Sequence, residues 1–397
     1  MSDLPARDLQ PLWDELAAQA AHDARTNIAF PGATDITFSQ LSHLMTQVLF
    51  NNIGSPYDHG HGRNHTKTVE QQVVNIVGDL FRAPASRWGY VTSGSTEGTE
   101  HALLDARKRF PAAVIYTSAA AHYKIVELAD KLMMPLVVLN TDAGGAMDVA
   151  DLLGELAQRR DRPAVIVATA GTTMTEAVDD VPAIAAACEK LAITRRRIHV
   201  DGALSGLPLV LEPIAGVPRI DFTVHGVTSI VVSGHKFLST QTPCGVLVYR
   251  DPPHAATVAP VSYTGTASVT ILGSRSGHTP LLLYAALAGL GIEAHRKRVR
   301  ACRAMAAYAA SQLRGVGVDA MRHPHAFTVY FPPLPPTMAA EWVQPTDDQH
   351  GHLICMPQVT TTQIDAFAAA AATAITSCPH AAPLPARRRQ DKATVAT

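Results

Sequence analysis

The chain has 397 residues, which is enough for two domains or for one large α/β domain with a smaller companion. Its residues are 47% hydrophobic and 17% charged, a composition typical of a globular core and unlike a disordered chain or a nucleic-acid-binding surface. The formal net charge is -1, so no overall field favours an acidic or a basic partner.

No segment has the composition of a targeting or membrane signal. The apolar runs are too short to span a bilayer, and residues 1–14 carry acids and prolines in place of an apolar signal core. The five cysteines lie far apart without CxxC spacing, which is typical of a reducing compartment and does not indicate a disulfide framework or a structural zinc. We therefore expect a cytoplasmic protein with no membrane and no nucleic acid among its partners.

The first predicted element is a helix over residues 8–25, where Leu9, Leu12, Trp13 and Leu16 have helical spacing. We expect this helix to pack on the body of the protein or on a partner subunit. From residue 66 onward, helices alternate with strands. Helices are predicted at 68–81, 95–110, 122–133, 150–159 and 181–192, and strands at 88–92, 113–117, 136–139, 164–168, 197–200, 230–233 and 245–249. This alternation predicts an α/β fold with a mostly parallel sheet covered by helices on both faces.

The C-terminal part has a different pattern. A long Ala-rich helical stretch over residues 280–313 leads to a smaller unit with strands at 327–331 and 353–356 and a final helix at 362–376. We therefore expect four parts, of which the tail is disordered because it mixes Pro, Ala and basic residues. They are an N-terminal helical segment (1–55), a large cofactor-binding domain (56–280), a small C-terminal α/β domain (281–378) and the tail (379–397).

The segment SGHKF at residues 233–237 places Lys236 directly after a β-branched run that indicates a buried strand. A lysine amine has a pKa near 10.4 and is normally left in water, so a lysine at the end of a core strand must be paired, desolvated or used covalently. Covalent use by a carbonyl cofactor and an ordinary turn lysine are both open from this segment alone.

Two other predicted strands also end in polar residues. The segment TSGSTEG at 92–98 joins a strand to a helix, so its small residues, Ser95, Thr96 and the helix N-terminus could bind an anion, or simply cap the helix. Asp201 ends the strand before it and needs a cationic partner if it is buried, although it could instead cap the next segment. Because ligands in such sheets lie beyond the carboxyl ends of the strands, we expect these groups to converge.

His122 follows a strand and a run of small residues that leave space for a flat ring above the imidazole. A single histidine is more often structural, and 18 histidines make chance placement easy. The order of anion loop, histidine, strand-end aspartate and strand-end lysine removes much of this ambiguity, because that order is the one expected of a fold type I pyridoxal-phosphate enzyme.

The longer motifs resemble the group II pyridoxal-phosphate-dependent amino-acid decarboxylases, above all the bacterial histidine decarboxylases and the plant serine decarboxylases. The segments that carry the resemblance are WGYVTSGSTEG (88–98), AGTT (170–173), DGALSG (201–206), SGHK (233–236), PCGV (243–246) and GSRSGH (273–278). The similarity extends from about residue 51 to residue 331. It implies a fold like that of aspartate aminotransferase, with a large domain and a small C-terminal domain.

The resemblance implies pyridoxal 5'-phosphate as the cofactor and assigns three catalytic residues. Lys236 binds the cofactor covalently, Asp201 pairs with its pyridine nitrogen and His122 stacks on its ring. The remaining implied cofactor contacts are Ser95, Thr96, Thr173, Ala203, Ser233, His235 and Ser274. Ser274 is expected to come from a neighbouring subunit, so the resemblance also implies a homodimer, or a higher homo-oligomer, with shared active sites.

The chain departs from these relatives where the substrate is expected. Histidine decarboxylases have a serine where Ala326 stands, and losing that hydroxyl weakens the case for a polar imidazole substrate. Histidines and glycines replace an aromatic pocket loop at residues 57–65. His59, His61 and His65 are expected to line the substrate entrance or bind the substrate carboxylate, because no carboxylate or cysteine set completes a metal site around them.

These patterns predict decarboxylation of a neutral L-amino acid to the primary amine and CO2. Histidine and a small aliphatic or hydroxy amino acid, valine or serine, are about equally compatible, and Ala326 slightly favours the aliphatic substrate. An aminotransferase or a decarboxylation-dependent transaminase is the alternative, but neither Arg314 nor Arg322 has a convincing setting for binding a substrate carboxylate. A non-catalytic scaffold is disfavoured because Lys236 and Asp201 are both intact.

Overall fold

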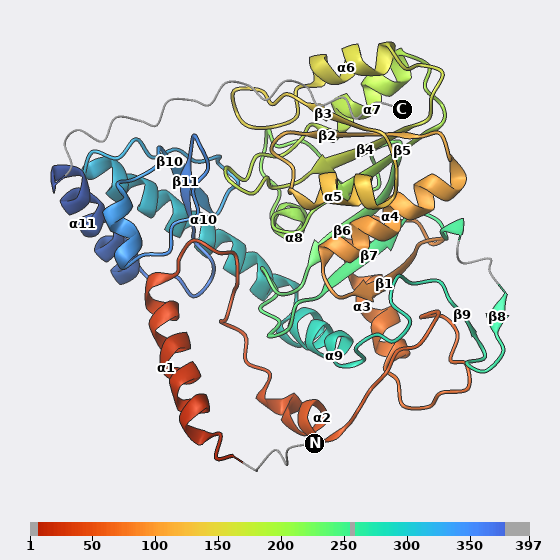
Figure 1. Ribbon diagram of the computed structural model, residues 1–397, viewed down its shortest axis with the longest axis horizontal. Coiled ribbons are helices and arrows are strands. Elements are labelled where there is room, and N and C mark those ends of the chain that lie inside the picture. The colour runs from red at the N-terminus through yellow and green to blue at the C-terminus, as the bar shows by residue number, and fades with distance from the viewer. Residues whose placement is uncertain (1–6, 255–258, 378–397) are drawn as a thin grey trace, which may run out of the picture.

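A seven-stranded sheet forms the centre of the computed structural model, which describes residues 7–254 and 259–377 (Figure 1). The strand order is β1-β7-β6-β5-β4-β2-β3. Strand β7 runs antiparallel to both of its neighbours and the other adjacent pairs are parallel, which confirms the predicted mostly parallel α/β sheet. The strands are β1 (Trp88–Thr92), β2 (Val114–Ser118), β3 (Leu136–Leu139), β4 (Ala164–Thr169), β5 (Arg196–Asp201), β6 (Val227–Ser233) and β7 (Gly245–Tyr249).

Helices cover both faces of this sheet. Gly98 in α4 lies over the side chain of Val231, and Gly206 in α8 lies over the next side chain, Val232. Successive side chains of a strand point to opposite faces, so α4 and α8 lie on opposite sides of β6. The helices of this part are α3 (Lys67–Leu80), α4 (Ser95–Arg109), α5 (Lys124–Lys131), α6 (Val149–Ala157), α7 (Val181–Lys190) and α8 (Gly206–Leu211).

The C-terminal unit consists of a two-stranded antiparallel sheet and helices. Its elements are α10 (Ile292–Gly315), β10 (Thr328–Phe331), the 3-10 helix Pro336–Ala340, β11 (Gly351–Ile354) and α11 (Thr361–Ser377). One apolar core continues from the large sheet into this unit, since Val232, Val299 and Phe327 belong to the same cluster. The expected domain boundaries therefore stay a prediction, and the expected disordered tail lies outside the described residues.

The stretch predicted to be helical over residues 280–313 is helical but interrupted. The chain forms α9 (His278–Tyr284) and a π-helical segment (Ala285–Gly289), and it breaks at Gly291 before α10 begins. Gly291 has φ +82, a conformation that glycine adopts without the steric cost a side chain would bring. Apolar periodicity does not detect this break because the helical spacing resumes one residue later.

Several short elements were not predicted. They are the 3-10 turn Ser39–Leu41, α2 (Ser42–Gln47), α8, and the hairpin of β8 (Pro260–Val261) and β9 (Thr266–Ala267). Each of them has six residues or fewer, too few for a helical or strand period to repeat. Among the described helices, none combines the length and apolarity that crossing a membrane requires.

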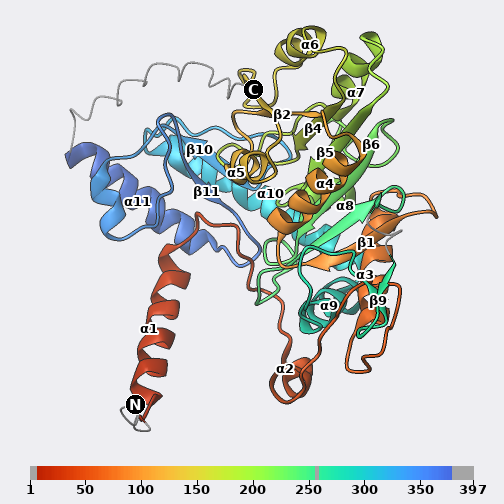
Figure 2. The same ribbon diagram turned by 45° about the vertical axis from the view of Figure 1, so that its right-hand side comes forward.

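Helix α1 (Gln10–Thr26) extends away from the rest of the molecule (Figures 1 and 2). Its apolar residues Leu9, Leu12, Trp13 and Leu16 are all exposed, with Trp13 51% accessible. Thr26 is the buried residue of this helix. These side chains therefore do not pack on the body of the single chain. Packing on a partner subunit stays a prediction.

A buried ion pair connects the turn at residues 273–277 to the large sheet. Both nitrogens of the Arg275 fork donate to the Glu70 carboxylate, which also accepts hydrogen bonds from Asn52 Nδ2 (2.8 Å) and the Val91 backbone N–H (2.9 Å). Glu70 and Arg275 are 0% and 5% exposed. Removing one member of such a pair leaves the other charge buried without compensation. The turn that carries Ser274 therefore depends on Glu70 in α3.

We predict that Glu70→Gln lowers the free energy of unfolding by about 3 kcal/mol or more, because it leaves the Arg275 guanidinium buried without a counter-charge. Urea denaturation followed by circular dichroism measures the change. Glu293→Gln is the matched control: it removes the exposed pair between Glu293 and Arg300, which solvent screens, so the free energy of unfolding should change far less than in Glu70→Gln. Equal effects of the two variants would contradict the assignment of the buried pair as structural.

Candidate active site

The carboxyl ends of two neighbouring parallel strands bring an acid and an amine to one cavity. Asp201 ends β5 opposite Val231 of β6, and Lys236 follows three residues after β6 ends at Ser233. Both side chains line a cavity of about 290 Å³. Its other lining residues are Ser93, Gly94, Ser95, Thr96, Glu97, Thr99, His122, Lys124, Ile125, Leu128, Ala203, Ser233, His235 and Pro243.

Lys236 is held on its backbone by a segment far away in the sequence. Its carbonyl oxygen accepts a hydrogen bond from the Ala33 N–H at 3.2 Å. The segment that follows α1 therefore passes directly beside this residue. Burial lowers the pKa of the Lys236 amine, while the carboxylates of Asp201 and Glu176 partly oppose that shift. The amine therefore loses its proton more readily than an exposed lysine and is better suited to attack a carbonyl carbon.

Asp201 and His122 also line the cavity. The Asp201 carboxylate accepts a hydrogen bond from the Ala203 N–H at 3.1 Å, which orients it at the end of its strand. His122 accepts from the Lys124 N–H at 3.3 Å through Nδ1. Burial lowers the pKa of His122, and Asp201 opposes this shift. A neutral imidazole is suited to contact with the face of a flat aromatic ring.

The N-terminus of α4 reaches the same cavity, where its chemistry suits an anion. Ser95 begins this 15-residue helix, and its hydroxyl lies 2.7 Å from the hydroxyl of Ser233 at the end of β6. Thr96 and the free backbone N–H groups of the first helical turn also line the cavity. Burial lowers the pKa of His235, whose Nδ1 lies 3.1 Å from the Cys244 carbonyl oxygen.

A buried histidine behind the cavity connects α4 to the sheet. His199 Nε2 lies 3.1 Å from Thr99 Oγ1 in α4, and its Nδ1 lies 2.9 Å from Ser229 Oγ in β6. Burial, reinforced by the charge of Arg197, lowers the pKa of His199 to about 3. The ring is therefore neutral at physiological pH and acts as a fixed spacer between the anion-binding helix and strands β5 and β6.

The residues expected to contact the cofactor are only partly brought together. Ser95, Thr96, His122, Asp201, Ala203, Ser233, His235 and Lys236 line the cavity. Thr173 is exposed and is not among the lining residues. Ser274 is exposed on the turn that contains Arg275, where its hydroxyl accepts a hydrogen bond from Asn51 Nδ2 at 3.2 Å. The roles of Thr173 and Ser274 stay predictions.

The expected substrate residues lie outside this cavity in the single chain. His59 Nδ1 lies 3.0 Å from His65 Nε2, and the His61 N–H donates to the Thr264 carbonyl of the β8–β9 hairpin at 2.9 Å. Ala326 is fully buried just before β10. No group of three or more His, Cys, Asp or Glu side chains in residues 7–254 and 259–377 is placed to hold a metal ion.

Sequence reasoning missed Lys124, which lines the cavity from the start of α5. Its amine donates to Glu127 at 2.5 Å, and this hydrogen bond raises the pKa of Lys124. Its place in the sequence, two residues after His122, was a signal that it could lie near the site. The apolar side chains Ile125 and Leu128 were also missed, because a helical period does not reveal which neighbour the helix faces.

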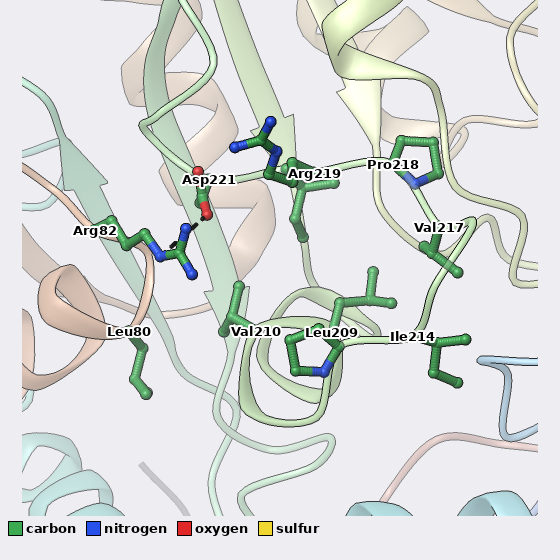
Figure 3. A pocket seen from close by; sticks show the side chains of 11 residues that line it. Leu80, Arg82, Leu209, Val210, Ile214, Val217, Pro218, Arg219 and Asp221 are labelled. Carbon is green, nitrogen blue, oxygen red and sulfur yellow. Dashed lines mark ion pairs between the residues drawn. The ribbon is translucent and has the colours of Figure 1, made fainter.

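A second hollow, of about 170 Å³, lies away from these groups (Figure 3). Apolar side chains such as Leu80, Val210 and Ile214 line most of it, and the side chains of Arg82 and Asp221 point toward each other across it at 3.7 Å. All of its lining residues come before β6 in the chain, whereas the first cavity includes Lys236, which follows the carboxyl end of that strand. The chemically competent groups are therefore at the first cavity.

The residues of the first cavity fit pyridoxal 5'-phosphate. A desolvated amine suits the aldehyde carbon, a carboxylate suits a protonated pyridine nitrogen, and a helix N-terminus with adjacent hydroxyls suits the phosphate. These three chemistries belong to Lys236, Asp201 and the Ser95–Thr96 turn in one continuous lining.

We predict that Lys236 reacts with an acylating reagent at lower pH than Lys124 does in the cofactor-free protein. Burial lowers the pKa of Lys236, so its free amine appears below the ordinary value of 10.5, whereas Glu127 raises the pKa of Lys124. Competitive acetylation across a pH series, read by peptide mass spectrometry, gives both midpoints. A midpoint for Lys236 at or above that of Lys124 would contradict the assignment.

Comparison with known proteins agrees with this geometry. Residues 36–321 match the model of the pyridoxal-dependent decarboxylase conserved domain. A histidine decarboxylase of Mesorhizobium japonicum is 36% identical over 361 residues, 90% of this chain and 96% of the relative. A serine decarboxylase of Oryza sativa is 34% identical and covers 86% of this chain and 77% of the relative.

Solved structures show the same fold. The L-methionine decarboxylase of Streptomyces superposes with a TM-score of 0.81 at 22% identity, covering 94% of this chain and 96% of the other. A glutamate decarboxylase of Lactobacillus brevis gives 0.78 at 21% identity, covering 96% of each chain. The fold is that of the fold type I pyridoxal-phosphate enzymes. The chain belongs to the pyridoxal-dependent decarboxylases and is an amino-acid decarboxylase of the histidine and serine decarboxylase type that uses pyridoxal 5'-phosphate.

Proposed function

We propose that the enzyme converts a neutral L-amino acid to its primary amine and CO2. The observation that carries this proposal is the single cavity lined by the Lys236 amine, the Asp201 carboxylate and the N-terminus of α4. Relatives named as histidine and serine decarboxylases support a neutral substrate. Histidine and a small aliphatic or hydroxy amino acid, valine or serine, are the candidates.

The chain's own side chains account for the main requirements of this reaction. Pyridoxal phosphate, when bound, supplies the electron sink for the carbon that loses CO2. Asp201 would hold the pyridine nitrogen and keep it protonated, and His122 would contact the ring face. Ile125 and Leu128 contribute apolar wall to the same cavity, which excludes water and disfavours a charged carboxylate relative to neutral CO2.

An aminotransferase or a decarboxylation-dependent transaminase is the alternative, and three hydrogen bonds count against the aminotransferase. Arg314 Nε donates to the Ala320 carbonyl at 2.7 Å, and Arg322 donates to the carbonyls of His323 and Pro324. Both guanidinium groups are thus oriented toward backbone oxygens of the C-terminal unit, and neither arginine is among the residues that line the cavity, where a clamp for a substrate carboxylate would have to lie. This supports release of the carboxylate as CO2.

The substrate side of the cavity is proposed to include the histidine loop and Ala326. His59, His61 and His65 are carried by a loop that packs against the β8–β9 hairpin, next to the turn that contains Ser274. Because none of these histidines lines the cavity of its own chain, the loop is proposed to reach the entrance of a partner's site. Ala326 offers no hydroxyl to an imidazole substrate, which favours an aliphatic one.

A homodimer, or a higher homo-oligomer, with shared active sites is proposed as the working state. The exposed apolar face of α1 supports it, because four large apolar side chains on one helix face favour burial. The exposed Ser274 hydroxyl would then serve the cavity of the neighbouring subunit. We place the enzyme in the cytoplasm, which is compatible with four free, buried cysteines (Cys188, Cys244, Cys302 and Cys355).

The function is tested by incubating the protein, saturated with pyridoxal phosphate, separately with each of the twenty amino acids. We expect one neutral amino acid to yield its primary amine and CO2, identified by mass spectrometry. Asp201→Asn should lower kcat at least a hundredfold, because a neutral amide does not keep the ring nitrogen protonated. The matched control, Asp161→Asn, changes an exposed turn residue and should leave kcat unchanged. A keto acid product in place of the amine would establish the aminotransferase alternative.

We further predict that Leu12→Asp combined with Leu16→Asp converts the oligomer to monomers, because charges are introduced on the exposed apolar face of α1. Sedimentation velocity measures the mass. Ala18→Asp places the same charge on the opposite face of the helix and should leave the oligomer intact. An oligomer that persists with both leucines replaced would show that α1 is not part of the interface.

A further inference from the structure

Glu176 is a buried acid that none of the functions above uses. It lies in the turn between β4 and α7, is 1% exposed, and has φ +58. A residue with a side chain is strained in this left-handed region, whereas glycine is not. The turn therefore retains a strained backbone and a buried carboxylate at the same position, which indicates that the side chain has a role there.

The Glu176 carboxylate accepts four hydrogen bonds from two distant parts of the chain. Its Oε1 accepts from Ser205 Oγ at 2.7 Å, immediately before α8. Its Oε2 accepts from the backbone N–H of Phe327 at 3.0 Å and from both the N–H (2.8 Å) and the hydroxyl (2.6 Å) of Thr328. The carboxylate thus joins the large sheet to the first residues of β10, and the Glu176 carbonyl oxygen also lies 2.8 Å from His325 Nε2.

The strand end that Glu176 holds is packed against the segment of Lys236. The ring of Phe327 lies 6.0 Å from the ring of Phe237, the residue next to Lys236. On its other side Phe237 contacts the guanidinium of Arg298, 4.5 Å from the ring centre, and Arg298 is paired with Asp35. Phe237 is fully buried between these groups. Movement of Phe327 would therefore free one side of the residue that follows Lys236.

We propose that Glu176 is a positioning residue for Lys236: its carboxylate fixes Phe327 at the start of β10, and Phe327 in turn fixes Phe237 and the direction of the lysine side chain. The proposal rests on the assignment of Lys236 as the cofactor-binding lysine. The carboxylate also has a separate electrostatic effect: its negative charge stabilises the protonated Lys236 amine and opposes the shift in pKa caused by burial.

Two substitutions separate the positional effect of Glu176 from the effect of its charge. Glu176→Gln removes the charge, but its amide oxygen can still accept from Phe327 and Thr328 while its NH2 donates to the Ser205 hydroxyl. Glu176→Gly relieves the strained backbone and removes every side-chain bond. If position is the cause, the glutamine variant resembles the wild type and the glycine variant does not.

The first measurement is hydrogen exchange of the peptide that covers residues 325–331, which is independent of catalysis. We expect exchange at least tenfold faster in Glu176→Gly and within threefold of wild type in Glu176→Gln. Ala192→Gly is the matched control: it also places glycine at a positive φ, +55, but in an exposed turn after α7. It should leave exchange in 325–331 unchanged. Unchanged exchange in Glu176→Gly would overturn the proposal.

The second measurement is the rate at which the cofactor-free protein combines with pyridoxal phosphate, followed by the absorbance of the bound cofactor. We expect Glu176→Gly to be at least tenfold slower and Glu176→Gln to be within threefold of wild type. Phe327→Leu removes the aromatic contact but keeps the hydrogen bonds of Glu176, so it should slow combination without changing exchange. This variant also serves if Glu176→Gly does not fold.

Two further results would overturn the positioning role. One is a Glu176→Gln variant as impaired as Glu176→Gly, which would assign the effect to charge; the other is a Phe327→Leu variant that combines at the wild-type rate. Failure of the proposed function looks different. A wild-type protein that binds pyridoxal phosphate but releases no amine from any amino acid would refute the substrate proposal while leaving the exchange and combination results in force.

Discussion

The structure depends on the burial of one amine, that of Lys236, at the carboxyl edge of the sheet. Desolvation disfavours its charged form, and the neighbouring strand supplies the carboxylate that limits this cost. Asp201 and Lys236 can be neighbours because β5 and β6 are adjacent and parallel, so both strands end at the same edge. The same edge receives the N-terminus of α4, whose free N–H groups favour an anion. The convergence of parallel strand ends at one edge thus brings the lining of one cavity together from three separate segments.

Buried polar groups connect the distant segments around this edge. His199 holds α4 on β6, Arg275 and Glu70 hold the turn of Ser274 on α3, and Glu176 holds β10 on the large sheet. Each buried charge among them is satisfied by several partners, as the cost of desolvation demands. The positions of the cavity-lining residues therefore depend on these specific hydrogen bonds and ion pairs, and not on apolar packing alone.

The local patterns of the sequence were sufficient for most of the sheet. The strands at 88–92, 136–139 and 245–249 have the predicted bounds because each is a short apolar run flanked by residues that end it. The break at Gly291 and the short helix α8 were not predicted, since neither changes the apolar period over a full window. The hairpin β8–β9 escaped for the same reason, although it carries the contact to the histidine loop.

For the site, the sequence by itself indicated that Lys236, Asp201 and Ser95 converge, because strand ends in a parallel sheet meet at one edge, a rule that needs only chain order. The roles expected of these residues came from the resemblance of their motifs to the pyridoxal-phosphate-dependent decarboxylases. Tertiary structure alone decided what surrounds them. Ala33 donates to the Lys236 carbonyl, Lys124 faces the cavity, and Glu176 reaches β10 across a long stretch of chain. These contacts depend on which faces pack together, and a one-dimensional pattern contains no information about the partner that a given face will meet.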